Sequence, residues 1–228
     1  MRVSVVDWLG WQFIEVSCEA EDGATAADQA HDTYAQCRRA LGRFGLTLDD
    51  TVRSRLWSVD RAARDAASDI RSATLSGKAR AASSSYISPG HFHSRANVGL
   101  DLIAVKPRPG FAKAIRENEP PRVPCRYLTV GPLLVLSGQT AVLPTLEIQV
   151  TTNILPRITQ YLAEARSGWD RVANVSCYMH SSQDPAEMKA LFRRMVPVDP
   201  PRFEICFVEG YSAEGKLVEL EVTAERDI

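Results

Sequence analysis

The sequence has no long apolar run, no excess of one charge and no secretion signal, and each absence excludes a class of protein. No stretch approaches the roughly 18 apolar residues that a membrane-spanning helix needs. The first residues, MRVSVVDWLGW, do not have the basic-then-apolar layout of a signal peptide. A formal net charge of −1 leaves no electrostatic footprint for nucleic acid or an anionic membrane. We therefore expect a cytoplasmic protein that binds neither.

Paired cysteines and nucleotide-binding glycine motifs are also missing. The five cysteines are odd in number, widely scattered and never in CxxC spacing: Cys18, Cys37, Cys125, Cys177 and Cys206. This argues against a disulfide framework and against a zinc site, and favours free thiols in a reducing compartment. The chain contains no GxGxxG, no P-loop and no GxSxG motif.

What the chain does contain is an internal repeat with an offset of about 120 residues. The matching positions keep their order and nearly constant spacing: Gln29 with Gln149, Asp50 with Asp170, Arg80 with Arg202, and Ala104 with Ala224. The arginine pair lies 122 residues apart, which needs a small insertion between them. The repeat predicts two units, at residues 1–106 and 126–228, joined by a proline-rich linker over 107–125.

Hydrophobic periodicity predicts the same ββαβαββ layout in both units. In the first unit we expect strands at 3–7, 11–17, 52–59, 80–87 and 97–105, with helices after residue 26 and over 61–74. In the second we expect strands at 126–130, 133–137, 171–179, 202–208 and 217–225, with a short helix over 185–195. Its long helix contains Pro156, which should kink that helix or delay its start. This order is α+β: a mostly antiparallel sheet with helices on one face.

Five motifs of the second unit agree in order and spacing with one known family. They are GPLLVLSGQ at 131–139, Gln149 on a helix, WDRVANVSCYM at 169–179, PPRFEI at 200–205 and KLVELEVTA at 216–224. This set resembles the RidA/YjgF family of imine- and enamine-processing proteins. The first unit keeps the order of these elements but matches fewer of the motif residues.

The resemblance implies a YjgF/chorismate-mutase-like fold, with sheets around a three-fold barrel and sites in the clefts between units. It implies no metal and no organic cofactor. It assigns the substrate carboxylate to Arg202, and activation of the attacking water to Glu219. It also places the SGQ corner, Ser137, Gly138 and Gln139, at the substrate. A guanidinium can hold a planar carboxylate through two parallel hydrogen bonds, and one carboxyl group can supply and then remove a proton.

Glu204 is the main departure from the family pattern. It shares a strand face with Arg202, so it either neutralises that arginine or adds a second, catalytic carboxylate to the pocket. Spacing alone also allows a purely structural alternative. In it, Arg202 only pairs with Glu204, and the strand face that carries Glu219 and Glu221 is exposed to solvent. The resemblance favours the functional interpretation for Arg202 and Glu219, and leaves Glu221 as a surface residue.

The first unit is less well equipped for this chemistry. Gly99 stands where the repeat has Glu219, and Val16-Ser17-Cys18 replaces the SGQ corner, so we expect a degenerate site despite Arg80. His91 and His93 alternate in a way that can serve a metal, but no third ligand is nearby, and a hairpin loop is favoured.

Three functions remain open from the sequence. The first is a hydrolase or deaminase for an imine, enamine or related C=N compound that bears a carboxylate. The second is a same-fold enzyme with other acid–base chemistry, such as chorismatase-like hydrolysis, cyclisation or tautomerisation. The third is a ligand-binding or scaffold protein without turnover. Because a family barrel needs three units and this chain supplies two, we also expect a homotrimer.

Overall fold

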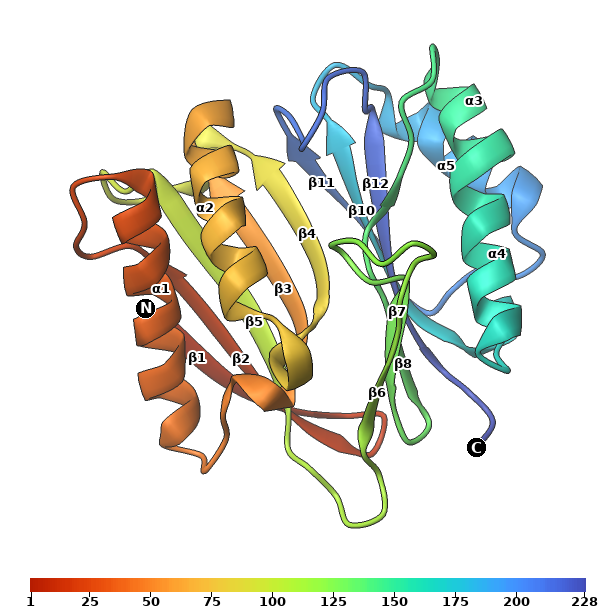
Figure 1. The fold of residues 1–228 in the computed structure, drawn as a ribbon. Helices are drawn as coiled ribbons and strands as arrows, with labels where there is room; N and C mark the ends of the chain where they lie inside the picture. Colours follow the sequence, from red (N-terminus) through yellow and green to blue (C-terminus); the bar gives the residue numbers. More distant parts are fainter.

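A computed structural model describes residues 1–228 as two β-sheets, each covered by helices on its outer face. Figure 1 shows helices α1 and α2 over the first sheet, and helices α3, α4 and α5 over the second. The predicted α+β architecture of two tandem units is confirmed. No helix of the chain has the length and apolar character to cross a bilayer.

The first unit forms a five-stranded sheet in the order β1-β2-β5-β3-β4. Its elements are β1 (Arg2–Trp8), β2 (Trp11–Glu19), α1 (Ala26–Gly42), β3 (Thr51–Ser58), α2 (Arg61–Thr74), β4 (Ala82–Ile87) and β5 (Val98–Val105). Strands β1 and β2 join through Leu9 and Gly10, whose φ angles of 49° and 69° give the left-handed turn that suits a tight hairpin.

Helix α1, predicted to follow residue 26, carries one apolar stripe that packs on the sheet. Thr25 and Asp28 form a capping box at its start, which satisfies the first free backbone N–H groups. The stripe residues Tyr34, Cys37 and Leu41 are completely buried against the sheet. Packing of this face, rather than helix propensity alone, holds the helix in place.

The second unit repeats this order, and its sheet adds two strands, β6 (Lys113–Arg116) and β9. Its elements are β7 (Tyr127–Val130), β8 (Leu133–Leu136), β9 (Gln139–Thr140), α3 (Leu146–Gln149), α4 (Leu155–Glu164), β10 (Val172–His180), α5 (Pro185–Met195), β11 (Phe203–Val208) and β12 (Val218–Glu225). The sheet runs β11-β10-β12-β8-β7-β6, with β9 paired to β12. In both units one strand pair is parallel, β3 with β4 and β10 with β11.

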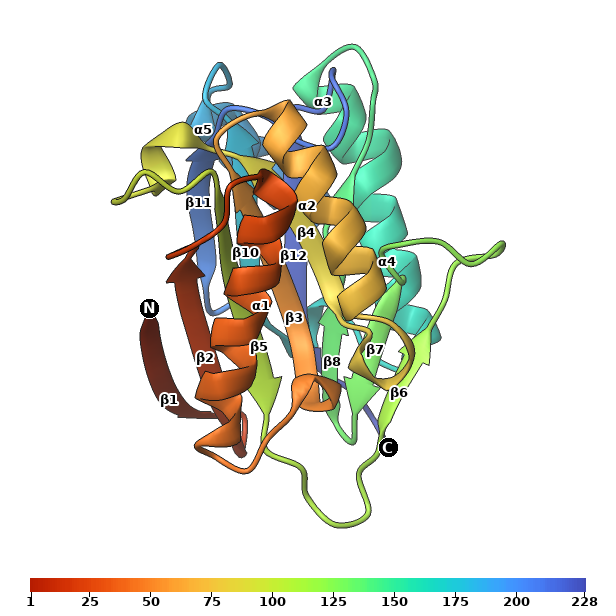
Figure 2. The ribbon, with the colours of Figure 1, turned by 60° about the vertical axis from the view of Figure 1, so that its left-hand side comes forward.

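Two details depart from the sequence interpretation. The long helix widens into a π-helical turn at Val150–Ile154, just before Pro156, where the missing proline N–H interrupts the regular ladder. Within the predicted linker 107–125, residues Lys113–Arg116 form β6, which pairs with β7. Figure 2 shows the β5–β6 connection looping out beneath the sheets before β6 joins the edge of the second one. The linker is therefore partly a strand of the second sheet.

The two sheets pack face to face, and this contact is apolar at one end. A cluster there draws on both units: Trp11, Phe13, Val52, Ala82, Val105, Leu128, Val130, Leu133 and Val135. Farther along β3, β4 and β12, the facing side chains are charged and polar. Buried charges need partners, so this polar stretch is where a site is to be sought.

Candidate functional site

A buried polar cluster lies between the units. Arg53 and Arg55 reach it from β3 and Tyr86 from β4, all in the first unit, while Glu219 and Glu221 reach it from β12 in the second. Alternation along β12 places both glutamates on the face turned toward the first unit. The apolar residues that alternate with the glutamates have the opposite orientation and pack under the helices: Val218, Leu220 and Val222.

Glu221 is a buried carboxylate held by two arginines. Its exposed fraction is 1%, and its Oε2 lies 2.9 Å from Arg53 Nη1 and 2.8 Å from Arg55 Nη2. Burial opposes ionisation of this group, yet the two guanidinium charges outweigh it and lower the pKa of Glu221 to about 2. Glu221 is therefore ionised at neutral pH and ties the two units together.

Glu219 has the opposite environment. It is 5% exposed and forms no salt bridge with any arginine or lysine. Burial raises its pKa, and the neighbouring charge of Glu221 adds to this, whereas the Lys216 ammonium group works against it. Two adjacent carboxyls whose pKa values move apart are typical of an acid and its fixed counter-charge.

Tyr86 sits between these carboxyls. Its hydroxyl oxygen lies 3.0 Å from Glu221 Oε1 and 3.3 Å from Glu219 Oε1. The ring is fully buried and stacks on Tyr178 at a centroid distance of 4.1 Å. Burial raises the pKa of Tyr86 well above its usual value, so its hydroxyl keeps its proton.

The SGQ corner lies against this cluster. Ser137 is buried, and its hydroxyl accepts a hydrogen bond from the Ser83 backbone N–H of the first unit at 3.3 Å. A methyl group on Gly138 would overlap the Glu219 carboxyl, so only glycine allows that carboxyl to lie there. Gln139 turns back and donates to the Ser137 carbonyl at 2.8 Å. The structure thus places Gly138 directly against Glu219, while Ser137 contacts the first unit and Gln139 pairs with Leu220, the residue after Glu219.

A cavity of about 370 Å³ opens beside Gly138, a size that suits a small metabolite. Four cationic side chains line it and no acidic one does: Arg122, Arg126, Arg157 and Lys216. Arg126 has a carboxylate partner, Glu164, at 3.5 Å, whereas Lys216 donates to the Ser212 hydroxyl. The cavity is therefore suited to an anion.

Arg202 and Glu204 do not belong to this cluster. Strand β11 is an edge strand; Glu204 lies in it and Arg202 directly before it, and their side chains are 45% and 64% exposed. They pair with each other, with Arg202 Nη2 at 2.6 Å from Glu204 Oε1. The register places them on the same sheet face as Glu221, two strands away. Because they lie at an open edge, neither lines the cavity beside Glu219.

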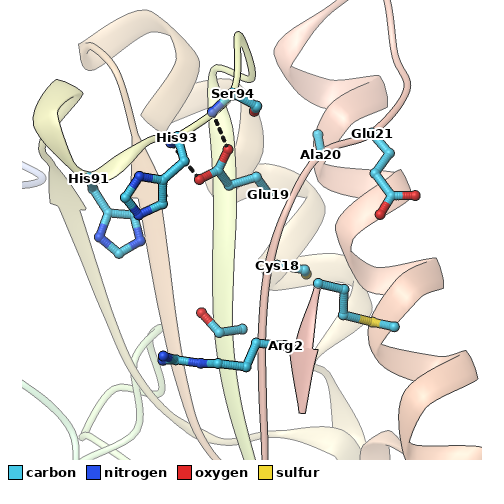
Figure 3. A pocket seen from close by; sticks show the side chains of 10 residues that line it. Arg2, Cys18, Glu19, Ala20, Glu21, His91, His93 and Ser94 are labelled. Atoms are coloured by element: carbon cyan, nitrogen blue, oxygen red, sulfur yellow. Dashed lines mark hydrogen bonds between the residues drawn. The ribbon is translucent and has the colours of Figure 1, made fainter.

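The first unit has its own cavity at the corresponding place, of about 560 Å³ (Figure 3). Glu19 accepts hydrogen bonds there from the backbone N–H groups of His93 and Ser94, at 2.8 and 2.9 Å. No carboxyl takes the position of Glu219, because Gly99 lies there with the Phe92 ring 3.3 Å from where a Cβ would be.

The predicted histidine pair has structural partners in this first-unit cavity. His91 stacks on Trp57 at 4.0 Å, while Figure 3 shows the backbone of His93 directed at Glu19. No three His, Cys, Asp or Glu side chains of the chain converge as metal ligands.

Sequence reasoning missed three residues of the site and misjudged a fourth. Arg53, Arg55 and Tyr86 come from the first unit, which was expected to be degenerate, and Glu221 was taken for a surface residue. One signal was available: an Arg-x-Arg strand and a Glu-x-Glu strand carry opposite charges at the same two-residue spacing. Such a match is typical of strands that face each other across a packed interface.

Comparison with known proteins bears on the fold. No family model matches the chain, and no curated protein does. A chorismatase crystal structure covers 98% of this chain and 79% of its own, with 13% identity and a TM-score of 0.66. A YjgF/YER057c/UK114 family member from Mycobacterium tuberculosis matches 50% of this chain and 99% of its own, at 21% identity and a TM-score of 0.43. RidA from the Antarctic bacterium Psychrobacter matches 46% and 89%, at 16% identity and 0.42. The chorismatase shows that the whole two-unit fold occurs in a known structure.

Proposed function

We propose that the chain is an acid–base hydrolase for a small carboxylate-bearing C=N compound, with Glu219, at the interface between the units, as its acid–base group. The observation that carries this proposal is the pair of adjacent buried carboxyls whose pKa values are shifted in opposite directions. Glu221 is fixed as an anion by Arg53 and Arg55, whereas burial raises the pKa of Glu219, and a cavity lined by cationic side chains opens beside it at Gly138.

Imine hydrolysis needs a proton at nitrogen and a water at carbon, and Glu219 can serve both steps. Glu219 first gives its proton to the imine nitrogen. Its carboxylate then takes a proton from the water that attacks the carbon, which gives a carbinolamine. Glu219 returns that proton to nitrogen, ammonia leaves as the C–N bond breaks, and the Glu219 carboxylate takes the proton of the carbinolamine hydroxyl as the carbonyl group forms. The water is thereby consumed and the protonated Glu219 is restored.

The substrate carboxylate would bind the cavity cations. Lys216 is the central one, because it lines the cavity and its charge also reaches Glu219. Arg157 adds a planar guanidinium that can bind a carboxylate through two hydrogen bonds. This assigns substrate binding to the cavity wall rather than to Arg202, whose side chain is exposed and paired.

A second candidate reaction is the hydrolysis of a vinyl ether. Fold similarity to a chorismatase over nearly the whole chain favours it. The same groups would act: Glu219 would protonate the terminal vinyl carbon, and water would attack the resulting oxocarbenium carbon. The two reactions differ in product, since an imine releases ammonia and an enolpyruvyl ether releases pyruvate.

Turnover of both substrate classes tests the proposal. The purified protein is mixed with α-imino acids formed in situ, and separately with enolpyruvyl ether carboxylates, while ammonia and pyruvate are followed. We expect ammonia release by the unmutated protein and a loss of at least about 100-fold in Glu219→Gln. Glu204→Gln, the same change at an exposed position, should retain full activity. Equal rates in Glu219→Gln and the unmutated protein would contradict the proposal, and pyruvate release alone would select the second reaction.

A further inference from the structure

The Tyr86 hydroxyl has one proton and two carboxyl neighbours. It lies 3.0 Å from Glu221 Oε1 and 3.3 Å from Glu219 Oε1. The Ser84 hydroxyl is a second hydrogen-bonding group beside both carboxyls. A phenol donates a single hydrogen bond and accepts others. While Tyr86 donates to the Glu221 carboxylate, its contact with Glu219 is satisfied only if Glu219 carries a proton and donates it to the phenol oxygen.

Loss of the proton from Glu219 reverses this arrangement. The new carboxylate then needs a donor in a buried site, and the Tyr86 hydroxyl lies 3.3 Å from it. Glu221 tolerates the loss of Tyr86, because Arg53 and Arg55 still hold it at 2.9 and 2.8 Å. Rotation about the Cζ–O bond is enough to redirect the hydroxyl. The ring itself stays packed against Tyr178, Trp57 and Tyr211.

We infer that Tyr86 is a positioning residue that lets Glu219 alternate between acid and base by turning its hydroxyl from Glu221 to Glu219. This inference rests on the proposed role of Glu219 in acid–base chemistry. It gives the first unit a direct part in the site, although that unit has no carboxyl at Gly99. The two units then contribute different groups to one site. The second unit supplies Glu219, which carries the proton, and the first supplies Tyr86, whose hydroxyl changes its acceptor.

Other groups also face Glu219, and their charges and hydrogen bonds contribute to its pKa. They come from β4, β12, the loop before β12 and helix α2: Ser84, Tyr86, Glu221, Tyr211, Lys216 and Arg71. The cations Lys216 and Arg71 favour the ionised form, and the Glu221 charge opposes it. The Tyr86 hydroxyl lies within hydrogen-bond distance of both glutamates, and Tyr86→Phe removes it while the Ser84 hydroxyl, which lowers the pKa of both carboxyls, stays in place.

The test is a titration of the ligand-free protein. Glutamate is labelled with ¹³C at Cδ, and the Glu219 signal is assigned by its loss in Glu219→Gln. In Tyr86→Phe we expect the Glu219 midpoint to rise by about one to two pH units, because the ionised form loses a charge-assisted hydrogen bond. Tyr178→Phe is the matched control. It removes a hydroxyl from the neighbouring ring, which hydrogen-bonds to neither glutamate, and should leave the midpoint unchanged.

A second measurement uses the unmutated chain, so it holds even if Tyr86→Phe fails to fold. The ¹³Cζ shift of Tyr86 should change at the Glu219 midpoint as the hydroxyl exchanges one acceptor for the other. An unmoved Glu219 midpoint in Tyr86→Phe, or a constant Tyr86 shift across the titration, would overturn the inference. Neither readout needs a substrate. Turnover without these shifts would therefore refute the switch alone, and the shifts without turnover would refute the proposed function alone.

Discussion

Replacing Glu221 by glutamine tests the electrostatic core of the interface between the units. The carboxylate is 1% exposed and bridges Arg53 and Arg55, and both arginines come from the other unit. The amide keeps the shape of the side chain and removes its charge, which leaves two guanidinium groups close together without an anion. Breaking a buried ion pair in this way costs about 3–5 kcal/mol of unfolding free energy. Urea unfolding at neutral pH, followed by circular dichroism, measures that loss.

Glu204→Gln is the matched control for this experiment. It removes a carboxylate that also pairs with an arginine, Arg202, but both side chains are largely exposed, so the loss should stay below about 1 kcal/mol. A loss in Glu221→Gln no larger than that of Glu204→Gln would refute the reasoning.

Acidification provides the second arm of the same test. The folded-state pKa of Glu221 is lowered from its ordinary value of 4.5 to about 2. Its stabilising contribution is therefore complete above pH 4.5 and is lost as the pH falls toward 2. That difference corresponds to about 3 kcal/mol. The stability gap between the unmutated chain and Glu221→Gln should close over this range. A gap that stays constant would contradict the assignment of the charge to Glu221.

Three other predictions follow from the site and the fold. Gly138→Ala should lose about 1–3 kcal/mol in urea unfolding, because the new methyl group overlaps the Glu219 carboxyl; Gly42→Ala, where nothing lies within 4 Å, is the control and should not be destabilised. Lys216→Met should raise the KM for a carboxylate substrate by about tenfold or more with a smaller change in kcat, since it removes a charge from the cavity wall; an unchanged KM would place the carboxylate elsewhere. Light scattering should give three times the chain mass of 25.2 kDa if the predicted homotrimer forms, and a single chain mass at micromolar concentration would rule it out.

The fold was accessible from the sequence because its signals are local and repeated. The stripe of Tyr34, Cys37 and Leu41 indicated a helix with one buried face, and that face is buried in the structure. Alternation along residues 217–225 indicated a strand with two unlike faces, which β12 has. The π-helical turn before Pro156 was foreseen only as a kink or a late start, because proline shows where a helix is disturbed and not how the backbone accommodates it.

The site was only half accessible, for a physical reason. Glu219 and the SGQ corner lie within one unit, so a motif resemblance could assemble them. Arg55 and Glu221 lie 166 residues apart and meet only because two sheets pack face to face. Nothing local in the sequence specifies that packing. The spacing of Arg202 and Glu204 allowed two interpretations, and only the position of β11 at an open sheet edge distinguishes them.

The proposed function depends most on Glu219 being a protonated carboxyl, and Glu221 a carboxylate, at neutral pH. Infrared difference spectroscopy tests this directly, because a protonated carboxyl and a carboxylate absorb at different frequencies. We predict that Glu219→Gln removes a protonated-carboxyl band from the spectrum of the unmutated protein, and that Glu221→Gln removes only carboxylate absorption. A spectrum in which Glu219→Gln removes carboxylate absorption alone would contradict the account.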